Sequence, residues 1–314
     1  MRRGNAPGGA QVPAMGRKRA MAMVSLYVPA YNTARTIRQC LEHVFAQTRP
    51  PDEVVVVDDG SEDETGAIAA RCGVRVVRHE QNRGVGAARN TGLHAVRGDW
   101  VATVNADCVP EPQWLETLLR HIGQPGVVGA GGQMKEKFQQ SLADRWRAHY
   151  LTQTHGTQLL VTPPFLYGSN SVFHREALLS VGGYNEIYRR SFEDVDLSTR
   201  MMKAGGRLIY DPAAVVWHLH RDTPLSAVRT MWQWDFFSLP PPTRLLPLLK
   251  RLEKNARRTR FFLWRNFWAG NFALLPLDAL VLPYHSWLDL RWYWQHRRRR
   301  KGNVPPTVES KETR

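Results

Sequence analysis

Short apolar runs alternate with amphipathic stretches from residue 23 to about residue 130. The run Val54–Val57 is wholly apolar and β-branched, as expected for a strand that is covered on both faces of a parallel sheet. Ahead of it, Ile37, Leu41 and Val44 recur at helical spacing within Thr33–Gln47. The same patterns predict strands at Met23–Val28, Val74–Val77, Trp100–Val104 and Val127–Val128, and helices at Glu62–Cys72 and Gly86–Val96. This alternation predicts βαβ units and an α/β fold with a mostly parallel central sheet.

The pattern changes after residue 130. Periodicity predicts helices at Phe138–Thr154, Ser191–Ala204 and Leu225–Leu239, and short strands at Arg207–Tyr210 and Ala214–Trp217. Beyond residue 225 the chain becomes rich in Trp and Arg, and seven of its eleven Trp residues follow Met231. We therefore expect four parts: a disordered basic arm at 1–22, an α/β domain at 23–221, a helical extension at 222–296 and a disordered basic tail at 297–314.

The positive charge of the chain is concentrated at its two ends. The formal net charge is +15, yet residues 24–240 hold 22 basic and 23 acidic groups and are almost neutral. Residues 241–314 hold 16 basic and 5 acidic groups, a net charge of +11. Nucleic-acid binding requires a basic face on the folded domain itself, so the balanced middle of the chain argues against it. Basic ends fit an anionic membrane surface better.

Aromatic side chains stand beside arginines in the C-terminal part. Arg260 and Arg265, for example, flank Phe261, Phe262 and Trp264. This mixture suits helices that lie in a membrane interface, and a helical dimer or packing surface is the competing interpretation. No stretch reaches the ~18 consecutive apolar residues of a spanning helix.

The three cysteines give an expectation about location. Cys40, Cys72 and Cys108 are widely spaced and form no CxxC pair, which favours a reducing compartment. The N-terminal residues are basic but lack the apolar stretch of a signal peptide. We expect a cytoplasmic protein, with peripheral contact to the cytoplasmic face of a membrane.

Three polar loops follow predicted strands, at Pro29–Asn32, Asp58–Ser61 and Asn105–Cys108. In open α/β sheets, ligands bind at the carboxyl ends of strands, so these loops are expected to converge. Asp59 can accept hydrogen bonds from a nucleobase or ribose, or it can cap the next helix. The third loop offers oxygen ligands suited to Mg²⁺ or Mn²⁺ between two phosphates, or it is a simple turn. Arg89, in a glycine-rich stretch before a predicted helix, stands where a diphosphate could use it.

Two further groups have both a chemical and a structural interpretation. Ser191 and Asp194 match a helix capping box, whereas Glu193 or Asp194 could instead be a general base aimed at an acceptor hydroxyl. His218 follows a short apolar run and is either a hydrogen-bonded partner or, together with Asp107, a metal ligand.

Seven short motifs stand out in order along the chain. They are VPAYN at 28–32, VDDGS at 57–61, NRGVGAARNTGL at 82–93, NADCVP at 105–110, GSN at 168–170, FEDVDLSTRMMKAGG at 192–206 and VVWHLHR at 215–221. In this order they resemble the landmarks of the family 2 glycosyltransferases, over about residues 23–221. The resemblance implies a GT-A fold, which is Rossmann-like, and an inverting transfer from a nucleotide-diphosphate sugar assisted by Mg²⁺ or Mn²⁺.

The resemblance also implies roles for individual residues. Asp194 would be the catalytic base, with Glu193 beside it, and Asp107 would bind the metal, with His218 completing the coordination. The donor would be bound by Pro29, Ala30, Tyr31, Asn32, Asp59, Arg89, Asn105 and Ala106. The acceptor or sugar pocket would be lined by Gly168, Ser169, Asn170 and Trp217. The acceptor would be a glycan or a lipid-linked molecule in cell-envelope or surface glycan synthesis.

The chain departs from the family pattern at Asn105, where family members usually have Asp. This change puts a ribose or metal contact in doubt. The chain also lacks the QxxRW sequence and the spanning helices of processive members, so a single-transfer enzyme is expected. Two alternatives remain: a nucleotidyltransferase that uses the same crevice, and a catalytically silent binding protein that recruits partners through its basic ends.

Overall fold

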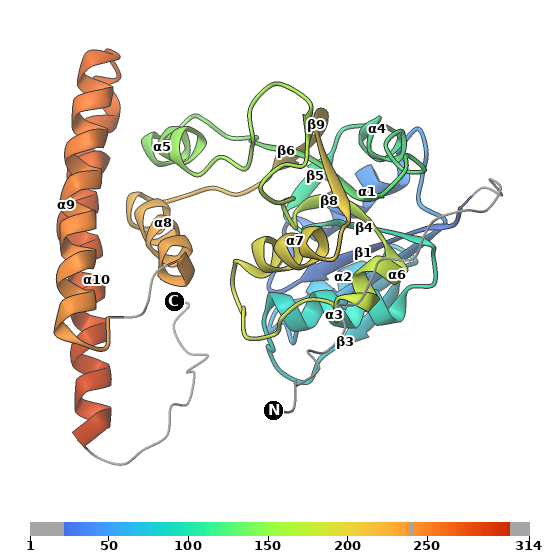
Figure 1. Cartoon of the computed structure of the whole chain (residues 1–314), viewed down its shortest axis with the longest axis horizontal. Coiled ribbons are helices and arrows are strands. Elements are labelled where there is room, and N and C mark those ends of the chain that lie inside the picture. The colour runs from blue at the N-terminus through green and yellow to red at the C-terminus, as the bar shows by residue number, and fades with distance from the viewer. Residues whose placement is uncertain (1–21, 239–241, 302–314) are drawn as a thin grey trace, which may run out of the picture. The chain divides into compact units, whose positions relative to one another are not determined.

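The computed structural model describes residues 22–238 and 242–301, and these form two compact units (Figure 1). The first, here called the sheet unit, contains the chain up to Lys137 and Gln153–Leu219. The second, the helical unit, contains Phe138–Thr152 and the chain from His220 onward. The expected disorder of residues 1–21 and 302–314 lies outside the described residues. Residues 297–301, also expected in the disordered tail, are helical instead.

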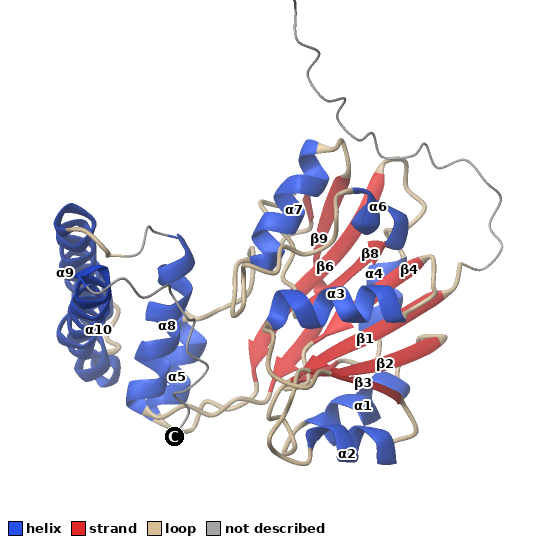
Figure 2. Cartoon of the chain, turned by 90° about the horizontal axis from the view of Figure 1, so that it is seen from below, coloured by secondary structure: helices blue, strands red, loops and turns tan. Residues whose placement is uncertain are grey.

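A nine-stranded mixed sheet is the centre of the sheet unit in the described part of the chain (Figure 2). Its strand order is β3-β2-β1-β4-β8-β6-β9-β5, and β7 pairs with β9. The strands are β1 Val24–Ala30, β2 Glu53–Asp58, β3 Arg75–Arg78, β4 Trp100–Val104, β5 Cys108–Pro110, β6 Val127–Glu136, β7 Leu160–Val161, β8 Asn170–His174 and β9 Arg207–His218. Neighbours among β1 to β4 are parallel, β8 is antiparallel to both β4 and β6, and β6 is parallel to β9. The α/β fold with a mostly parallel first half is confirmed.

Helices cover both faces of this sheet (Figure 2). They are α1 Ile37–Phe45, α2 Thr65–Arg71, α3 Val85–Ala95, α4 Trp114–Leu119, α6 Arg175–Ser180 and α7 Glu193–Lys203. Because successive strand residues point to opposite faces, Leu26 packs with the α1 side and its neighbour Tyr27 with the α3 side. The β-branched run of β2 is buried for the same reason, since both of its faces are covered.

The second half of the sheet differs from the expected elements. β6 has ten residues rather than the two expected, and β9 is one twelve-residue strand rather than two short ones. Pro212 lies inside β9, where it cannot donate a ladder hydrogen bond. The register between β6 and β9 shifts between Gly131 and Gln133, and this irregularity lets the strand continue past the proline.

The helical unit has its own apolar core. Its helices are α5 Leu142–Tyr150, α8 Pro224–Ser238, α9 Leu245–Trp268, the 3₁₀ helix η1 Phe272–Leu274 and α10 Leu275–Lys301. Trp146 of α5 packs with Val228, Phe262 and Val281 from the three longer helices, and its indole donates to buried Asp278 at 3.0 Å. The segment 138–152, which we expected in the α/β domain, therefore belongs to the core of the helical unit.

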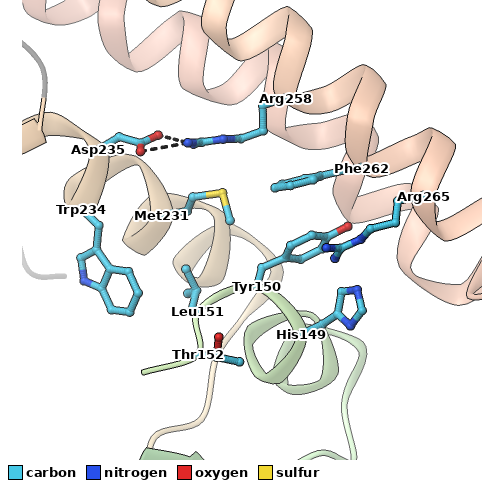
Figure 3. A pocket seen from close by; sticks show the side chains of 10 residues that line it. All are labelled: His149, Tyr150, Leu151, Thr152, Met231, Trp234, Asp235, Arg258, Phe262 and Arg265. Carbon is cyan, nitrogen blue, oxygen red and sulfur yellow. Dashed lines mark hydrogen bonds and ion pairs between the residues drawn. The ribbon is translucent and has the colours of Figure 1, made fainter. Parts of the chain in front are cut away.

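A cavity of about 450 Å³ lies within the helical unit (Figure 3). The rings of Tyr150 and Phe262 form part of its wall, and Arg258 is hydrogen-bonded to Asp235 there. None of the predicted site residues lines this cavity. Over residues 22–238 and 242–301, no helix combines the length and the apolar character needed to cross a membrane.

Candidate active site

The sheet topology brings several strand ends to one edge. The parallel strands β1, β2 and β4 end there at Ala30, Asp58 and Val104. The antiparallel strand β8 begins there, since its first residue Asn170 pairs with Val104. β9 ends there at His218, because β9 runs parallel to β6 and both β6 and β4 are antiparallel to β8. The three polar loops thus follow strands that end at a common edge, as the sequence predicted.

Asp107 and His218 meet at this edge. The Nε2 atom of His218 lies 3.2 Å from Oδ2 of Asp107, and its Nδ1 lies 2.8 Å from Oε2 of Glu136. The backbone sets this arrangement, since Glu136 pairs with His218 where β6 and β9 end. The imidazole is therefore held between two carboxylates.

The electrostatics of His218 favour positive charge at this point. Burial alone would lower its pKa, but the interactions with Asp107 and Glu136 outweigh burial and raise the pKa to about 9. A cation at Nε2, whether a proton or a metal ion, is thus stabilised by the surrounding carboxylates.

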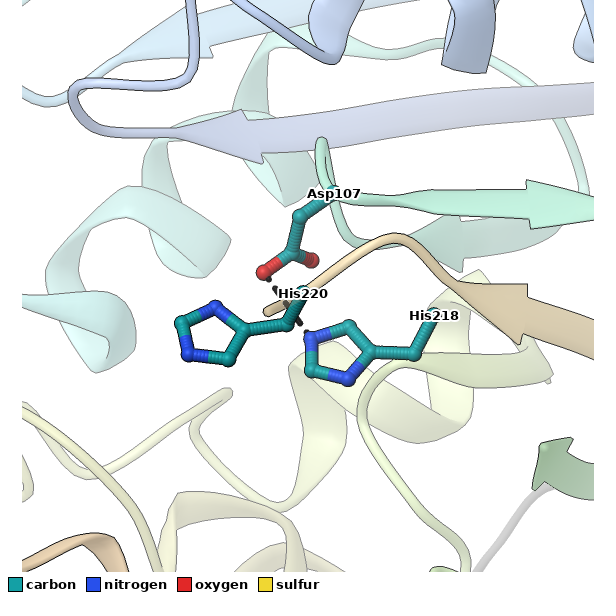
Figure 4. A group of neighbouring side chains, drawn as sticks. All are labelled: Asp107, His218 and His220. Atoms are coloured by element: carbon teal, nitrogen blue, oxygen red, sulfur yellow. Dashed lines mark hydrogen bonds and ion pairs between the residues drawn. The ribbon is translucent and has the colours of Figure 1, made fainter. Parts of the chain in front are cut away.

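His220, two residues beyond the end of β9, adds a third donor. One ligand atom each from Asp107, His218 and His220 lie within 4.8 Å of one another (Figure 4). Carboxylate oxygen and imidazole nitrogen form a donor set that Mn²⁺ and similar divalent ions accept. Glu136, on the other ring nitrogen of His218, orients the imidazole in the way that second partners of metal-binding histidines do. The residues therefore fit a divalent metal.

The start of α7 presents Asp194 at the same edge. Its Oδ2 atom accepts a hydrogen bond of 3.0 Å from the amide of Gly168, just before β8. Phe192, the residue before the first residue of α7, has φ +82°, a left-handed conformation that is unfavourable for a non-glycine residue and is often found at functional sites. Glu193 is buried at 4% exposure, whereas Asp194 is only partly buried. Of the two neighbouring acids, Asp194 is the one that solvent or a ligand can reach.

The capping box between Ser191 and Asp194 is not formed. The residue at the N-cap of α7 is Phe192, and no side chain accepts a capping hydrogen bond there. Asp194 instead accepts from its neighbour Val195 and from Gly168. The structural interpretation of this motif is therefore wrong, because the left-handed turn moves the helix start by one residue.

Arg89 connects α7 to the end of β4. Its guanidinium donates to Glu193 at 3.1 Å, to Thr103 at 3.0 Å and to the side-chain oxygen of Asn105 at 3.0 Å. Arg89 is only 2% exposed, and this burial argues against the direct diphosphate contact that the sequence suggested. Asn105, which replaces the usual Asp, is thus tied to a buried cation.

Glu193 has unusual electrostatics for a carboxyl group. Burial first and the neighbouring Asp194 second raise its pKa to about 7, and the ion pair with Arg89 only partly opposes them. One of its oxygens, Oε2, is buried without a hydrogen-bond partner. Glu193 is therefore held close to its protonation midpoint at neutral pH.

Asp59 has a bracing role in this structure. Its carboxylate accepts from His79 Nδ1 at 2.6 Å and from the amides of Arg83 and Gly84 at 2.9 and 2.8 Å. It is 3% exposed. These contacts fasten the loop before α3 to the end of β2, and they argue against a direct contact between Asp59 and a nucleobase.

The loop at residues 29–32 is joined to the loop after β2. Asn32 has φ +52°, donates its amide to Ser61 Oγ at 3.0 Å and accepts from the amide of Glu62 at 2.8 Å. Pro29 and Ala30 are the last residues of β1, and Tyr31 beyond them is exposed. Ala106, in the loop before β5, is buried. Of these five residues only Tyr31 and Asn32 are exposed, and Asn32 is already bonded to the loop after β2, so Tyr31 is the best placed to meet a ligand.

Gly168 and Asn170 help to build the edge. A Cβ atom at Gly168 would come within 2.8 Å of the Arg89 guanidinium, so glycine permits this close approach. Asn170 is fully buried, accepts from the indole of Trp114 and donates to two backbone carbonyls. Its burial makes Asn170 a structural residue rather than a wall of an acceptor pocket.

Ser169 and Trp217 complete the predicted pocket residues. Ser169 is buried and donates to Gln153 Oε1 at 2.6 Å. Trp217 is partly buried, donates to Glu111, and has the ammonium groups of Lys135 and Lys137 over its ring at 5.6 and 5.4 Å.

Sequence analysis missed Glu136 and Thr103. Thr103 lies inside β4, where a single hydroxyl gives no motif signal. Glu136 would have stood out as an acid at a strand end if β6 had been predicted at its full length.

These features define the class and then the family. A Rossmann-like sheet with carboxylate and histidine groups at one edge is the GT-A architecture, as expected. Residues 25–182 match the model described as "Glycosyl transferase family 2". The chain belongs to this family.

Curated relatives include glycosyltransferases from bacteria and archaea. The pre-mycofactocin glycosyltransferase of Mycobacterium tuberculosis is 32% identical over 207 residues, which cover 63% of this chain and 43% of that protein. The glucosyl-dolichyl phosphate glucuronosyltransferase of Haloferax volcanii is 29% identical over 242 residues, which cover 68% of this chain and 73% of that protein. The chain thus spans less than half the length of the first relative.

Solved structures share the fold at low sequence identity. A mannosyltransferase from Pyrobaculum calidifontis, in complex with GDP-Man and Mn²⁺, matches with a TM-score of 0.53 and 19% identity over 90% of this chain and 88% of that chain. GalNAc-T7 with UDP, GalNAc and Mn²⁺ matches with a TM-score of 0.53 and 18% identity over 68% of this chain and 48% of that chain.

Proposed function

We propose that the chain is an inverting glycosyltransferase that moves a sugar from a nucleotide-diphosphate donor to an acceptor hydroxyl with the help of a divalent metal. One observation carries the proposal: the partly exposed carboxylate of Asp194 and the Asp107–His218 pair belong to the same sheet edge. Arg89 connects the two segments that carry them, since it contacts Glu193, next to Asp194, and Asn105, two residues before Asp107. A one-step displacement requires a base and a metal site for the leaving diphosphate, and both must be held in fixed positions.

The proposed reaction balances in a single step. Asp194 accepts the proton of the acceptor hydroxyl while the oxygen of that hydroxyl attacks the anomeric carbon of the donor sugar. The new carbon–oxygen bond forms as the bond to the diphosphate breaks, and nucleoside diphosphate leaves. Asp107 and His218 would hold the metal ion, which when bound offsets negative charge on the leaving diphosphate. Gly168 fixes the direction of the Asp194 carboxylate through its amide.

Glu193 is a less suitable base than Asp194. Its side chain is almost fully buried and its Oε1 is paired with Arg89. We assign it a positioning role in which it holds Arg89, and through Arg89 the end of β4, next to the start of α7.

The donor and acceptor classes follow from the relatives. Two solved structures of this fold contain a nucleotide or nucleotide sugar together with Mn²⁺, which supports a nucleotide-sugar donor and Mn²⁺ here. The name of the archaeal relative, a glucosyl-dolichyl phosphate glucuronosyltransferase, supports a lipid-linked acceptor. We propose a single transfer per encounter, carried out at the cytoplasmic face of a membrane.

Product analysis tests the reaction class. A panel of nucleotide sugars is incubated with the full chain and Mn²⁺, and the released nucleotide is identified by mass spectrometry. Nucleoside diphosphate is the expected product. A nucleotidyltransferase would instead release pyrophosphate in a parallel incubation with nucleoside triphosphates and sugar phosphates, and no nucleoside diphosphate from the nucleotide sugars. No turnover of any donor, with donor binding intact, would favour a silent binding protein.

Calorimetry tests the metal site. Asp107→Ala should abolish the Mn²⁺-dependent part of donor binding, because it removes the carboxylate ligand. Asp211→Ala is the matched control, since Asp211 also pairs with a histidine, His121, at 2.7 Å in the same unit. Equal loss in both variants, or no loss in Asp107→Ala, would remove Asp107 from the site.

A further inference from the structure

The outward face of α9 exposes large apolar side chains. Each is between 51% and 73% exposed: Leu246, Leu249, Phe261, Trp264, Phe267 and Trp268. Their spacing, at 100° per residue, collects them on one side of the helix, opposite the buried side that includes Leu248, Asn255 and Phe262. Apolar patches of this kind on a folded protein mark contact surfaces.

The same face of α9 is cationic. Lys250, Arg257 and Arg260 are exposed between the apolar groups, and Glu253 is the one acid on this face. The acids of the described part of α10, Asp278 and Asp289, are both fully buried and bonded internally. They therefore do not neutralise the surface, and the net charge of this face stays positive.

α10 repeats the combination of aromatic rings and arginines. Leu282, Trp287, Leu290 and Trp294 are each between 36% and 52% exposed. The guanidinium of Arg291 lies 5.4 Å from the Trp287 ring centroid, and that of Arg297 lies 5.5 Å from the Trp294 ring. Trp and Arg side by side suit the headgroup level of a bilayer, where the ring and the aliphatic stem meet apolar chains and the cation meets phosphate.

We propose that the outward faces of α9 and α10 dock the protein on the surface of an anionic lipid bilayer. The proposal names the surface that would hold the enzyme at the membrane, and it rests on the proposed function, in which transfer takes place at a membrane. α9 has 24 residues, a length of about 36 Å, and it lies in the plane of the interface rather than across the bilayer. Its cations meet anionic headgroups while its rings enter the boundary of the acyl chains.

The charge of the surface decides between a bilayer and a second copy of the chain. A two-fold contact through α9 would bring Lys250, Arg257 and Arg260 of both copies together. Glu253 offers little relief, because it already lies 3.7 Å from Arg257 within the same helix. Like charges at such a contact oppose association, whereas anionic lipid attracts all three cations.

Vesicle flotation with the full chain tests the proposal. The probes are phosphatidylglycerol/phosphatidylcholine vesicles and pure phosphatidylcholine vesicles. We expect tight binding to the anionic vesicles, weakened by high salt, and much weaker binding to the neutral ones. Replacing Lys250, Arg257 and Arg260 with Gln should weaken anionic binding about 100-fold, from roughly five-fold per cation. Trp264→Ser/Trp268→Ser should weaken it at least about ten-fold.

Matched controls distinguish vesicle binding through α9 and α10 from non-specific binding through other exposed apolar side chains. Phe45→Ser/Ile187→Ser removes two exposed apolar side chains of the sheet unit, 47% and 74% exposed, and should leave vesicle binding unchanged. Asp194→Asn should also bind vesicles like the parent chain, so failure of catalysis and failure of docking are distinguishable. Circular dichroism and thermal unfolding check that each variant is folded.

Three outcomes would overturn the proposal. The first is no binding of the parent chain to anionic vesicles. The second is equal binding by the Trp264→Ser/Trp268→Ser variant or by the triple Gln variant. The third is dimerisation in analytical ultracentrifugation that the tryptophan variant abolishes, in the absence of vesicle binding, which would identify a second copy as the occupant.

Discussion

The two units of this chain differ in how completely their buried charged groups are hydrogen-bonded and in how much aromatic surface they expose. The sheet unit buries ionic groups at one edge and surrounds them with hydrogen bonds, as with Arg89, Glu193 and His218. The helical unit exposes several large aromatic side chains, such as Trp264 and Trp268, although Trp146 and Phe262 are in its core. Burying charge costs stability and is typical of chemical sites, whereas exposing rings is typical of contact surfaces. The contrast is consistent with the proposals that the sheet unit carries the reaction and the helical unit carries the membrane contact.

Two buried ion pairs make the contrast sharper. In the helical unit, Asp289 accepts from Arg251 at 2.7 Å and also from Trp232 and Asn255, so both of its oxygens are satisfied. In the sheet unit, Glu193 has one oxygen without a partner and a second carboxylate beside it. The carboxylate of the first pair is fully hydrogen-bonded, whereas that of the second is not and stays close to its protonation midpoint.

The largest expected effect is that of Asp194→Asn on turnover. Removal of a general base typically lowers the rate by about 10²–10⁴-fold. Donor binding should change little, because the amide side chain can still accept from Gly168. Steady-state kinetics and calorimetry measure the two quantities. Asp196→Asn, on the same helix and paired with Arg200, is the control; a comparable fall in its rate would deny Asp194 a special role.

The next effect concerns two neighbouring phenylalanines of α9. Phe262 is in the core of the helical unit and Phe261 is 52% exposed. Phe262→Ala should destabilise this unit by about 3–5 kcal/mol, through lost burial and the cavity left behind. Phe261→Ala should stay within about 0.5 kcal/mol. Denaturant unfolding measures both, and similar losses would contradict the assignment of the two faces of α9.

The smallest effect is a change in the pH dependence of stability. The pKa of Glu193 is raised from its ordinary 4.5 to about 7. Its contribution to stability is therefore complete below about pH 4.5 and is lost as the pH rises through 7, about 3 kcal/mol in total. Glu193→Gln mimics the protonated form and should lack this loss.

Thermal unfolding between pH 4.5 and 8 checks this expectation. The melting temperature of Glu193→Gln should rise relative to that of the parent chain as the pH increases. Glu186→Gln, at a carboxylate that is 45% exposed, should show no such trend. A constant difference between Glu193→Gln and the parent across this range would argue against the raised pKa.

Part of the helical unit could be read from the sequence and part could not. The aromatic and arginine composition after residue 225 pointed to a contact surface, and the helix predicted at Leu225–Leu239 matches α8. The membership of α5 in this unit did not follow, since the segment 138–152 lies more than 70 residues before α8. Only the packing of Trp146 against Phe262 and Val281 joins them.

Local periodicity determined the first half of the sheet unit. Alternating strands and helices, the buried run of β2 and the ordered motifs predicted the fold, the converging loops and the family. These features depend on spacings of two to four residues, which the sequence displays directly. The ion pair between Asp196 and Arg200 could also be predicted, because the two residues are four positions apart on one helix.

Only the tertiary structure decided the partners of the buried charged groups. Arg89 and Glu193 are 104 residues apart, and Glu136 and His218 are 82 apart. Strand register and the left-handed turn at Phe192 bring them together, and neither is visible in local spacing. A buried ionic group takes whatever partner the packed sheet supplies, because leaving it unpaired in a low dielectric is too costly. The sequence thus identified most of the candidate site residues, and only the folded structure determined which of them contact one another and which are exposed to a ligand.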